Sequence, residues 1–139
     1  MDPKYVVGIP DIDDQHEQIY RLIEALHEAA SRDSRKHLFR PALKRLQQLL
    51  STHFVCEEAL MGMVGFAGLP QHRRLHAELL KIFGDYLENA PVPERYDEVE
   101  RSIAEKVLGH VMSHDMQMIG MIKEYLQGLK GGSANGNAA

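Results

Sequence analysis

The chain has 139 residues, 6% aromatic residues and no tryptophan; this length suits one domain with a single core, and its helix-favouring residue types predict an all-α fold. The formal net charge of −4, without a lysine or arginine cluster that could neutralise a run of phosphates, argues against a nucleic-acid partner. No apolar run approaches the roughly 20 residues of a membrane span and no signal peptide is evident, so we expect no membrane partner and a cytoplasmic location, which agrees with the single cysteine.

Residues 1–10 are predicted to form a short arm that lies on the core, because Gly8 and Pro10 oppose regular structure. The first helix follows, with Asp11 or Asp13 as its cap. Its apolar and histidine positions alternate in steps of four and three, which places them on one face. These positions are Ile12, His16, Ile19, Ile23, Leu26 and Ala30. The buried face of this helix therefore includes a histidine.

A second helix is predicted after the polar turn 31–34. It begins near Arg35 or just before Pro41, since proline is tolerated in the first turn of a helix. Its inward positions are Phe39, Leu43, Leu46, Leu50, His53, Glu57, Leu60 and Val64. The spacing of three or four residues continues through His53 and Glu57, so both side chains are expected to point at the core.

The last two helices show the same pattern. After a glycine-rich loop over residues 62–70, the third helix begins near Pro70 and ends before residues 89–93. The fourth begins near Glu94. The inward positions of the third are Leu69, His72, His76, Leu79, Phe83 and Tyr86. Those of the fourth are Val99, Ile103, Val107, His110, Val111, Asp115, Met118, Ile122, Tyr125 and Leu129.

Four amphipathic helices with short connections predict an antiparallel up-down-up-down four-helix bundle with an N-terminal arm, because short loops place successive helices side by side. We assign residues 1–130 to this domain. Residues 131–139 contain only glycine, serine, asparagine and alanine and are expected to be a disordered tail or a truncated linker.

The inward histidines and carboxylates indicate a metal site. They are His16, His53, Glu57, His72, His76, His110 and Asp115. Residues four apart on a helix lie on one face, so His53 with Glu57, and His72 with His76, can reach one ion or two adjacent ions. An unpaired carboxylate costs several kcal/mol in an apolar core, whereas a bound cation offsets the desolvation of the whole set.

The number of these side chains indicates two metal ions, because a tetrahedral zinc site is complete with four ligands. Five imidazoles and two carboxylates suit iron best. If the carboxylates bridge the ions together with one oxygen, two octahedra are filled except for one position, where a small ligand would bind.

Other candidates have plainer interpretations. His27 and His37 fall off the inward faces and are expected to be solvated, whereas His114, four residues after His110, competes as a ligand. Cys56 is interpreted as a small packed residue, and Glu58 is expected to face solvent or to form a salt bridge. The methionines are interpreted as core filler rather than soft-metal ligands.

These residues resemble the hemerythrin family, particularly its bacterial single-domain members, over about residues 5–129. The matching segments are Gly8-Ile9 with Ile12-Asp13-Asp14-Gln15-His16, His53-Phe54 with Glu57-Glu58 and Met61, His72 with His76, and His110 with Asp115. All seven candidate ligands match the family's motif in order and spacing. The resemblance therefore implies a four-helix bundle with two iron ions, Fe²⁺ or Fe³⁺, joined by an oxo or hydroxo bridge.

The resemblance also implies how the ligands divide. The division is His72, His76 and His110 for one iron, His16 and His53 for the other, and Glu57 with Asp115 as bridges. The iron with two histidines would be five-coordinate in the diferrous state and would take up dioxygen end-on. Both irons would then be oxidised, with dioxygen held as a hydroperoxide and no side chain acting as acid or base.

The chain departs from the family pattern near this pocket. Lys106-Val107 stands where the family favours Trp-Leu. Val107, three residues before His110, is therefore expected to line a larger or wetter dioxygen pocket and to speed autoxidation. Met118 replaces the usual tyrosine after Asp115.

The leading functional hypothesis is a non-enzymatic dioxygen-binding protein that carries, stores or senses the gas, with nitric oxide as a second candidate ligand. Alternatives are a di-iron oxidase, peroxidase or nitric-oxide-handling enzyme, and a redox- or iron-sensing regulatory module. Ferritin-like oxidases use Glu-x-x-His pairs and carboxylate-rich ligation, so the His-x-x-x-Glu motif with a histidine majority favours binding. The tail leaves room for an output domain or a partner protein in a sensor.

Overall fold

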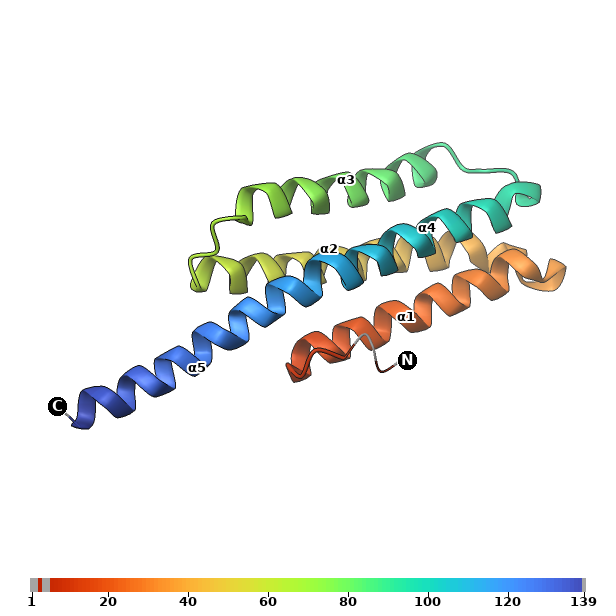
Figure 1. The fold of residues 1–139 in the computed structure, drawn as a ribbon. Coiled ribbons are helices and arrows are strands. Elements are labelled where there is room, and N and C mark those ends of the chain that lie inside the picture. The colour runs from red at the N-terminus through yellow and green to blue at the C-terminus, as the bar shows by residue number, and fades with distance from the viewer. Residues whose placement is uncertain (1–2, 4–5, 139) are drawn as a thin grey trace.

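The chain folds into an antiparallel four-helix bundle, as predicted (Figure 1). The computed structural model describes Pro3 and residues 6–138, with side chains as far as Leu129. The helices are α1 (Pro10–Ser31), α2 (Phe39–Met63), α3 (Leu69–Glu88), α4 (Tyr96–His110) and α5 (Met116–Ala138). A π-helical turn, η4 (Val111–Asp115), joins α4 to α5, so these two segments together form the fourth helix of the bundle. Connections alternate between the two ends, which gives the up-down-up-down order.

Short 3₁₀ segments precede two of the helices. The segment η2 (Asp33–Leu38) connects α1 to α2, and α2 begins at Phe39 with Pro41 in its first turn. Of the two predicted starting points, the one just before Pro41 is therefore correct, because the missing N–H of proline costs little in a first turn. The segment η3 (Pro93–Arg95) leads into α4 in the same way.

The core has two apolar clusters with a polar layer between them. The larger is built from α1, α2, α3 and α4 around residues such as Leu26, Leu46 and Phe83. The smaller contains Val7, Ile12, Met61, Met118, Ile119 and Ile122. Each helix of the bundle passes from one cluster to the other, and the buried histidines, together with Glu57 and Asp115, lie near the boundary between the two sets in the sequence.

The arm before α1 lies on the smaller cluster, where Val7 is 5% exposed. Residues 1, 2, 4 and 5 of the predicted arm lie outside the described residues. The carboxylate of Asp13 accepts hydrogen bonds from the backbone N–H groups of Val7, at 2.7 Å, and Gly8, at 3.1 Å. The prediction that Asp11 or Asp13 is the N-cap was wrong, because Ile9 occupies that position and Asp13 reaches back to the arm. Gly8 has a φ of +86°, which allows this turn.

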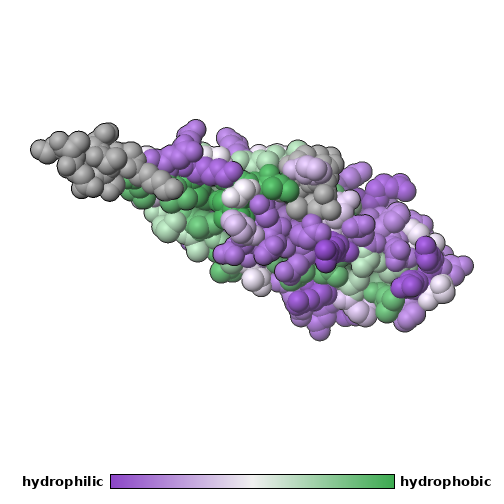
Figure 2. Space-filling model, turned by 90° about the horizontal axis from the view of Figure 1, so that it is seen from below, coloured by the Kyte–Doolittle hydropathy of each residue, from purple (hydrophilic) through white to green (hydrophobic). Residues whose placement is uncertain are grey.

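The far part of α5 extends beyond the other helices (Figure 1). Figure 2 shows apolar surface along it, where Met121, Tyr125, Leu126 and Leu129 stay exposed. The helix includes residues 131–138, which were predicted to be disordered; Ala139 lies outside the described residues, and a role of this segment as a linker stays a prediction. Among the described residues, none of the helices combines the length and the apolar character needed to cross a membrane.

Candidate metal centre

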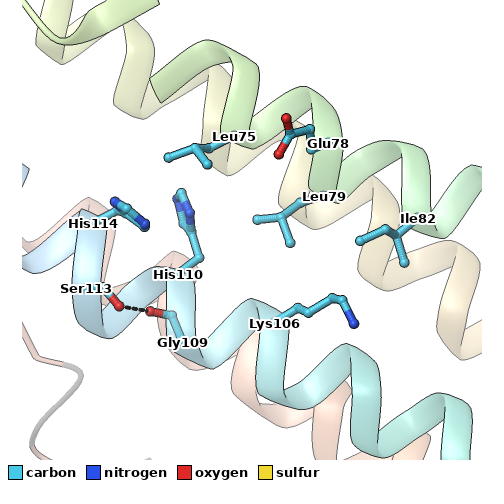
Figure 3. A pocket seen from close by; sticks show the side chains of 9 residues that line it. All are labelled: Leu75, Glu78, Leu79, Ile82, Lys106, Gly109, His110, Ser113 and His114. Carbon is cyan, nitrogen blue, oxygen red and sulfur yellow. Dashed lines mark hydrogen bonds between the residues drawn. The ribbon is translucent and has the colours of Figure 1, made fainter. Parts of the chain in front are cut away.

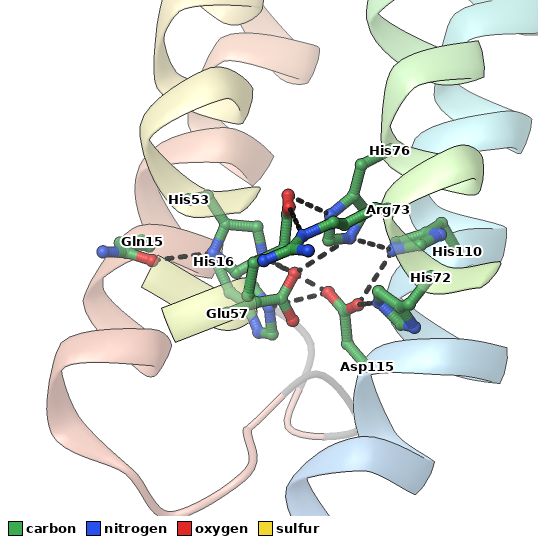
Figure 4. Close-up of polar contacts among 10 residues, drawn as sticks. Gln15, His16, His53, Glu57, His72, Arg73, His76, His110 and Asp115 are labelled. Carbon is green, nitrogen blue, oxygen red and sulfur yellow. Dashed lines mark hydrogen bonds and ion pairs between the residues drawn. The ribbon is translucent and has the colours of Figure 1, made fainter. Parts of the chain in front are cut away.

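All seven predicted ligands meet in the polar layer (Figure 4). His16 comes from α1, His53 and Glu57 from α2, His72 and His76 from α3, His110 from α4, and Asp115 from the end of η4. Each is buried, and His53, Glu57 and Asp115 are 0% exposed. The bundle therefore brings together every member of the predicted set.

The π-helical turn explains how Asp115 reaches this layer. Asp115 follows His110 by five positions, which in a regular α-helix would place the two side chains about 140° apart. In η4 the backbone N–H of Met116 instead donates to the carbonyl of Val111, five residues back. The wider turn restores the alignment, and both side chains point inward.

The ligand atoms form two overlapping groups. In each group, one ligand atom per residue lies within 4.8 Å of all the others. The first contains Glu57, His72, His76, His110 and Asp115, and the second contains His16, His53, Glu57 and Asp115. Both include the two carboxylates, so the arrangement has the form of two adjacent cation sites that share Glu57 and Asp115.

Asp115 is at the centre of the contacts between the groups. Its Oδ1 lies 2.9 Å from His110 Nε2 and 3.7 Å from His72 Nε2. Its Oδ2 lies 3.2 Å from His53 Nε2 and 3.5 Å from His16 Nε2. One carboxylate therefore faces imidazoles from three helices and from its own helix.

Glu57 occupies the opposite side of the layer. Its Oε1 lies 3.1 Å from His53 Nε2 and 3.5 Å from His76 Nε2. It therefore faces one imidazole of each group, as a bridging carboxylate must.

On the side of the ring away from the centre, the Nδ1 atoms of His53 and His76 face oxygen acceptors. His53 Nδ1 lies 2.7 Å from Gln15 Oε1, and His76 Nδ1 lies 3.0 Å from Glu58 Oε2. Because an amide or carboxylate oxygen can only accept, each Nδ1 carries the proton, and the ring's Nε2 faces the centre. Arg73 Nε donates to Glu58 Oε1 at 3.1 Å and holds that carboxylate in place.

These supporting contacts were not predicted from the sequence. Gln15 and Glu58 each lie next to a ligand in the sequence, but only the packing of helices shows which imidazole they reach. Glu58 does form a salt bridge, one of its two predicted roles, and its partner is Arg73.

The two central carboxyls have opposite pKa shifts. Burial raises the pKa of Glu57 to about 8, an effect that His76 opposes and Asp115 increases. Burial also acts to raise the pKa of Asp115, but the neighbouring imidazoles of His110, His16, His53 and His72 outweigh it and hold that pKa well below its usual range. Without a cation, one carboxyl of the pair therefore stays protonated near neutral pH.

The donor atoms fit a bound metal. Among the described residues, both oxygens of Glu57, Oδ1 of Asp115 and Nε2 of His72 are buried without a hydrogen bond of good geometry. His53 Nε2 can face Asp115 only as an N–H, and since Nδ1 also carries a proton, the ring would be a buried cation. A metal ion would replace that proton and satisfy the exposed lone pairs of the whole set.

Phe54 packs against two of the imidazole rings. It is 2% exposed and stacks on His76 with 3.8 Å between ring centroids and 6° between ring planes. It also meets His110 edge-on at 5.6 Å. The imidazoles are thus held both by hydrogen bonds and by packing.

The remaining candidates lie around the centre. His114 is exposed, and its ring lies 5.2 Å from that of His110 and 6.0 Å from that of His72. It lines a cavity of about 290 Å³ between α3 and α4, together with His110, Leu79 and Lys106 (Figure 3). His114 belongs to neither of the two ligand groups found among the described residues.

Val107 and Cys56 belong to neither of the two ligand groups found in the described part of the chain. Val107 is 1% exposed and belongs to the larger apolar cluster. Cys56 is partly buried, and its Sγ accepts a hydrogen bond from Gln15 Nε2 at 3.4 Å. His27, predicted to be solvated, has a largely exposed side chain and lies 3.2 Å from the carboxylate of Glu100.

The fold and the centre define a class of protein, a four-helix bundle with a buried histidine–carboxylate cluster able to bind metal. The family described as "Hemerythrin HHE cation binding domain" matches residues 7–127. The chain therefore belongs to the hemerythrin family.

Curated relatives agree with this assignment. A protein named bacteriohemerythrin from Stenotrophomonas maltophilia is 25% identical over 121 residues, covering 86% of this chain and 78% of the relative. A hemerythrin-like protein from Naegleria gruberi is 26% identical and covers 87% of this chain and 91% of the relative. A myohemerythrin from Riftia pachyptila is 27% identical over 79 residues, 57% of this chain and 60% of the relative. No solved structure matches the chain.

Proposed function

We propose that this protein is a non-enzymatic, di-iron dioxygen-binding protein that carries, stores or senses the gas. The observation that carries the proposal is the pair of ligand groups that share Glu57 and Asp115, in a chain of the hemerythrin family. A single metal ion would leave one of these groups without a cation.

In this proposal His72, His76 and His110 hold one iron, and His16 and His53 hold the other. Glu57 and Asp115 bridge the pair, together with an oxo or hydroxo group. When bound, the two irons supply the electrons for reversible dioxygen binding. We assign end-on binding to the iron that has only two histidines; the two irons would supply two electrons and a hydroxo bridge one proton, so that dioxygen would be held as a hydroperoxide and the bridge would become oxo.

The protein's own residues bury this centre and offset part of its charge. Apolar clusters lie on both sides of the polar layer. The two carboxylates offset cationic charge, and the Nδ1 protons of His53 and His76 are bound to Gln15 and Glu58, away from the centre. These features favour a binding site over a reaction that must move protons to a large substrate.

A sensor role has one observation in its favour. Asp115 ends the π-helical turn directly before α5, and α5 carries exposed apolar side chains beyond the bundle. A change at the centre could therefore be transmitted along a single helix to an output domain or a partner protein. Nitric oxide is a second candidate ligand of the same position, and a cytoplasmic location stays a prediction.

Anaerobic loading with ferrous iron, followed by repeated addition and removal of dioxygen, tests the proposal. We expect a visible absorption band that appears with dioxygen and disappears when the gas is removed. His53→Ala should abolish the reversible band, whereas His37→Ala, which changes an exposed histidine, should leave it unchanged. Prompt irreversible oxidation of the wild-type protein, or turnover of peroxide or nitric oxide, would support an enzyme or redox sensor instead.

A further inference from the structure

The Nδ1 groups of His53 and His76 donate to acceptors of different charge. His53 donates to the neutral amide oxygen of Gln15, at 2.7 Å. His76 donates to the carboxylate of Glu58, at 3.0 Å. Each contact joins a buried ring to a partly buried side chain of a neighbouring helix. The carboxylate of Glu58 is also paired with Arg73, at 3.1 Å.

The orientation of the Gln15 amide follows from its two neighbours. His53 Nδ1 requires an acceptor, so Oε1 must face the ring. The NH₂ group then points to Cys56 Sγ, which accepts at 3.4 Å. Gln15 and Cys56 also line a cavity of about 500 Å³ between α1 and α2, so a charged replacement at position 15 would have access to water.

We propose that Gln15 is a positioning residue for His53: it fixes the Nδ1–H tautomer and, because it is neutral, keeps this ring a weaker donor to its metal than His76, which faces the carboxylate of Glu58. A carboxylate partner draws the imidazole proton and makes the ring a stronger donor to its metal. An amide orients the ring without this effect. The inference rests on the proposed function where it concerns iron, and on the hydrogen bond alone where it concerns the tautomer.

The first test uses zinc and no dioxygen, so it is independent of the proposed function. The zinc-loaded protein, labelled with ¹⁵N-histidine, should show a slowly exchanging Nδ1–H signal from His53. Gln15→Leu should lose this signal and bind zinc about 10–100-fold more weakly, while Gln15→Glu should retain the signal with a changed shift. A His53 signal that survives unchanged in Gln15→Leu would overturn the positioning role.

The second test measures the reduction potential of the iron-loaded protein by spectroelectrochemistry under argon. Gln15→Glu should lower the potential and Glu58→Gln should raise it. Gln18→Glu is the matched control, since it makes the same charge change on an exposed position of α1 and should leave the potential nearly unchanged. Equal shifts in Gln15→Glu and Gln18→Glu would show a general charge effect and overturn the claim that the acceptor at position 15 tunes His53.

Different results would contradict the proposed function and the positioning role of Gln15. If the zinc-loaded signals behave as expected but the iron protein never binds dioxygen reversibly, the proposed function fails and the positioning role stands. If dioxygen binds reversibly and Gln15→Leu keeps both the signal and the affinity, the positioning role fails alone.

Discussion

His110 and Asp115 are five residues apart on one helix, yet His110 Nε2 lies 2.9 Å from Asp115 Oδ1. The π-helical turn Val111–Asp115 makes this contact possible. Asp115 is fully buried and is shared by both ligand groups. The register of a single turn therefore determines whether the two groups share this carboxylate.

Removal of Ser113, an exposed residue of this turn, tests that relationship. The deletion brings His110 and Asp115 to a spacing of four, which also places them on one face of a regular α-helix. We expect the variant to stay helical and to bind the same number of metal ions, as measured by circular dichroism and metal analysis. Removal of Ser102 from α4 instead rotates both ligands by about 100° relative to the start of the helix and should abolish binding. Loss of metal in a well-folded Ser113 deletion would contradict this account of η4.

Phe54 should matter for both stability and metal affinity, because it stacks on His76 and meets His110 edge-on. Replacement of this 2%-exposed ring in Phe54→Ala should lower the free energy of unfolding by about 3–5 kcal/mol. Urea unfolding of the metal-free protein measures this loss, and Phe54→Leu should retain more of the stability but still bind metal more weakly. Val55→Ala, at a neighbouring exposed position, serves as the control; a similar loss there would refute the packing role.

The raised pKa of Glu57 predicts a pH-dependent stability of the metal-free protein. Below pH 4.5 the carboxyl is protonated in both the folded and the unfolded chain, and between pH 4.5 and about 8 only the unfolded chain ionises. Stability should therefore fall as the pH rises through this window. The urea midpoint, measured with a chelator between about pH 5 and 9, should decline more steeply in wild type than in Glu57→Gln. Parallel curves would mean that Glu57 is ionised throughout.

Sequence periodicity predicted much of this molecule because side chains at helical spacing lie on one face of a helix, and that face is the one buried in the bundle. His53 and Glu57, or His72 and His76, are four residues apart, so a regular helix suffices to place them together. Asp115 is different: it was grouped with His110 from the pattern, but regular helical geometry does not bring it there. The inserted turn, which makes that grouping possible, was not predicted.

Contacts between helices could not be read from the sequence. Gln15 and Glu58 look like ordinary partly exposed positions, and their roles depend on how α1 meets α2 and α2 meets α3. Glu100 is a similar case, because this buried carboxylate of α4 pairs with His27 of α1. Asp13 was expected to cap a helix, whereas its position allows it to hold the arm.

Val107 offers a test of how the centre is protected. The side chain is 1% exposed within the larger apolar cluster and lies one turn before His110. Val107→Leu adds a methylene at the position predicted from the family pattern to line the dioxygen pocket, so we expect slower autoxidation, followed as the decay of the oxygenated spectrum. The extra volume should cost about 1–3 kcal/mol of stability. Autoxidation that is no slower in this variant would count against the predicted role of Val107.

The central claim is that one chain holds two metal ions that share Glu57 and Asp115. Native mass spectrometry of the anaerobically iron-loaded protein counts the ions directly. We expect two irons per wild-type chain, and one in the double variant His16→Ala with His53→Ala, because the group around His72, His76 and His110 remains intact. A single iron in wild type, or an unchanged count in the double variant, would contradict the account.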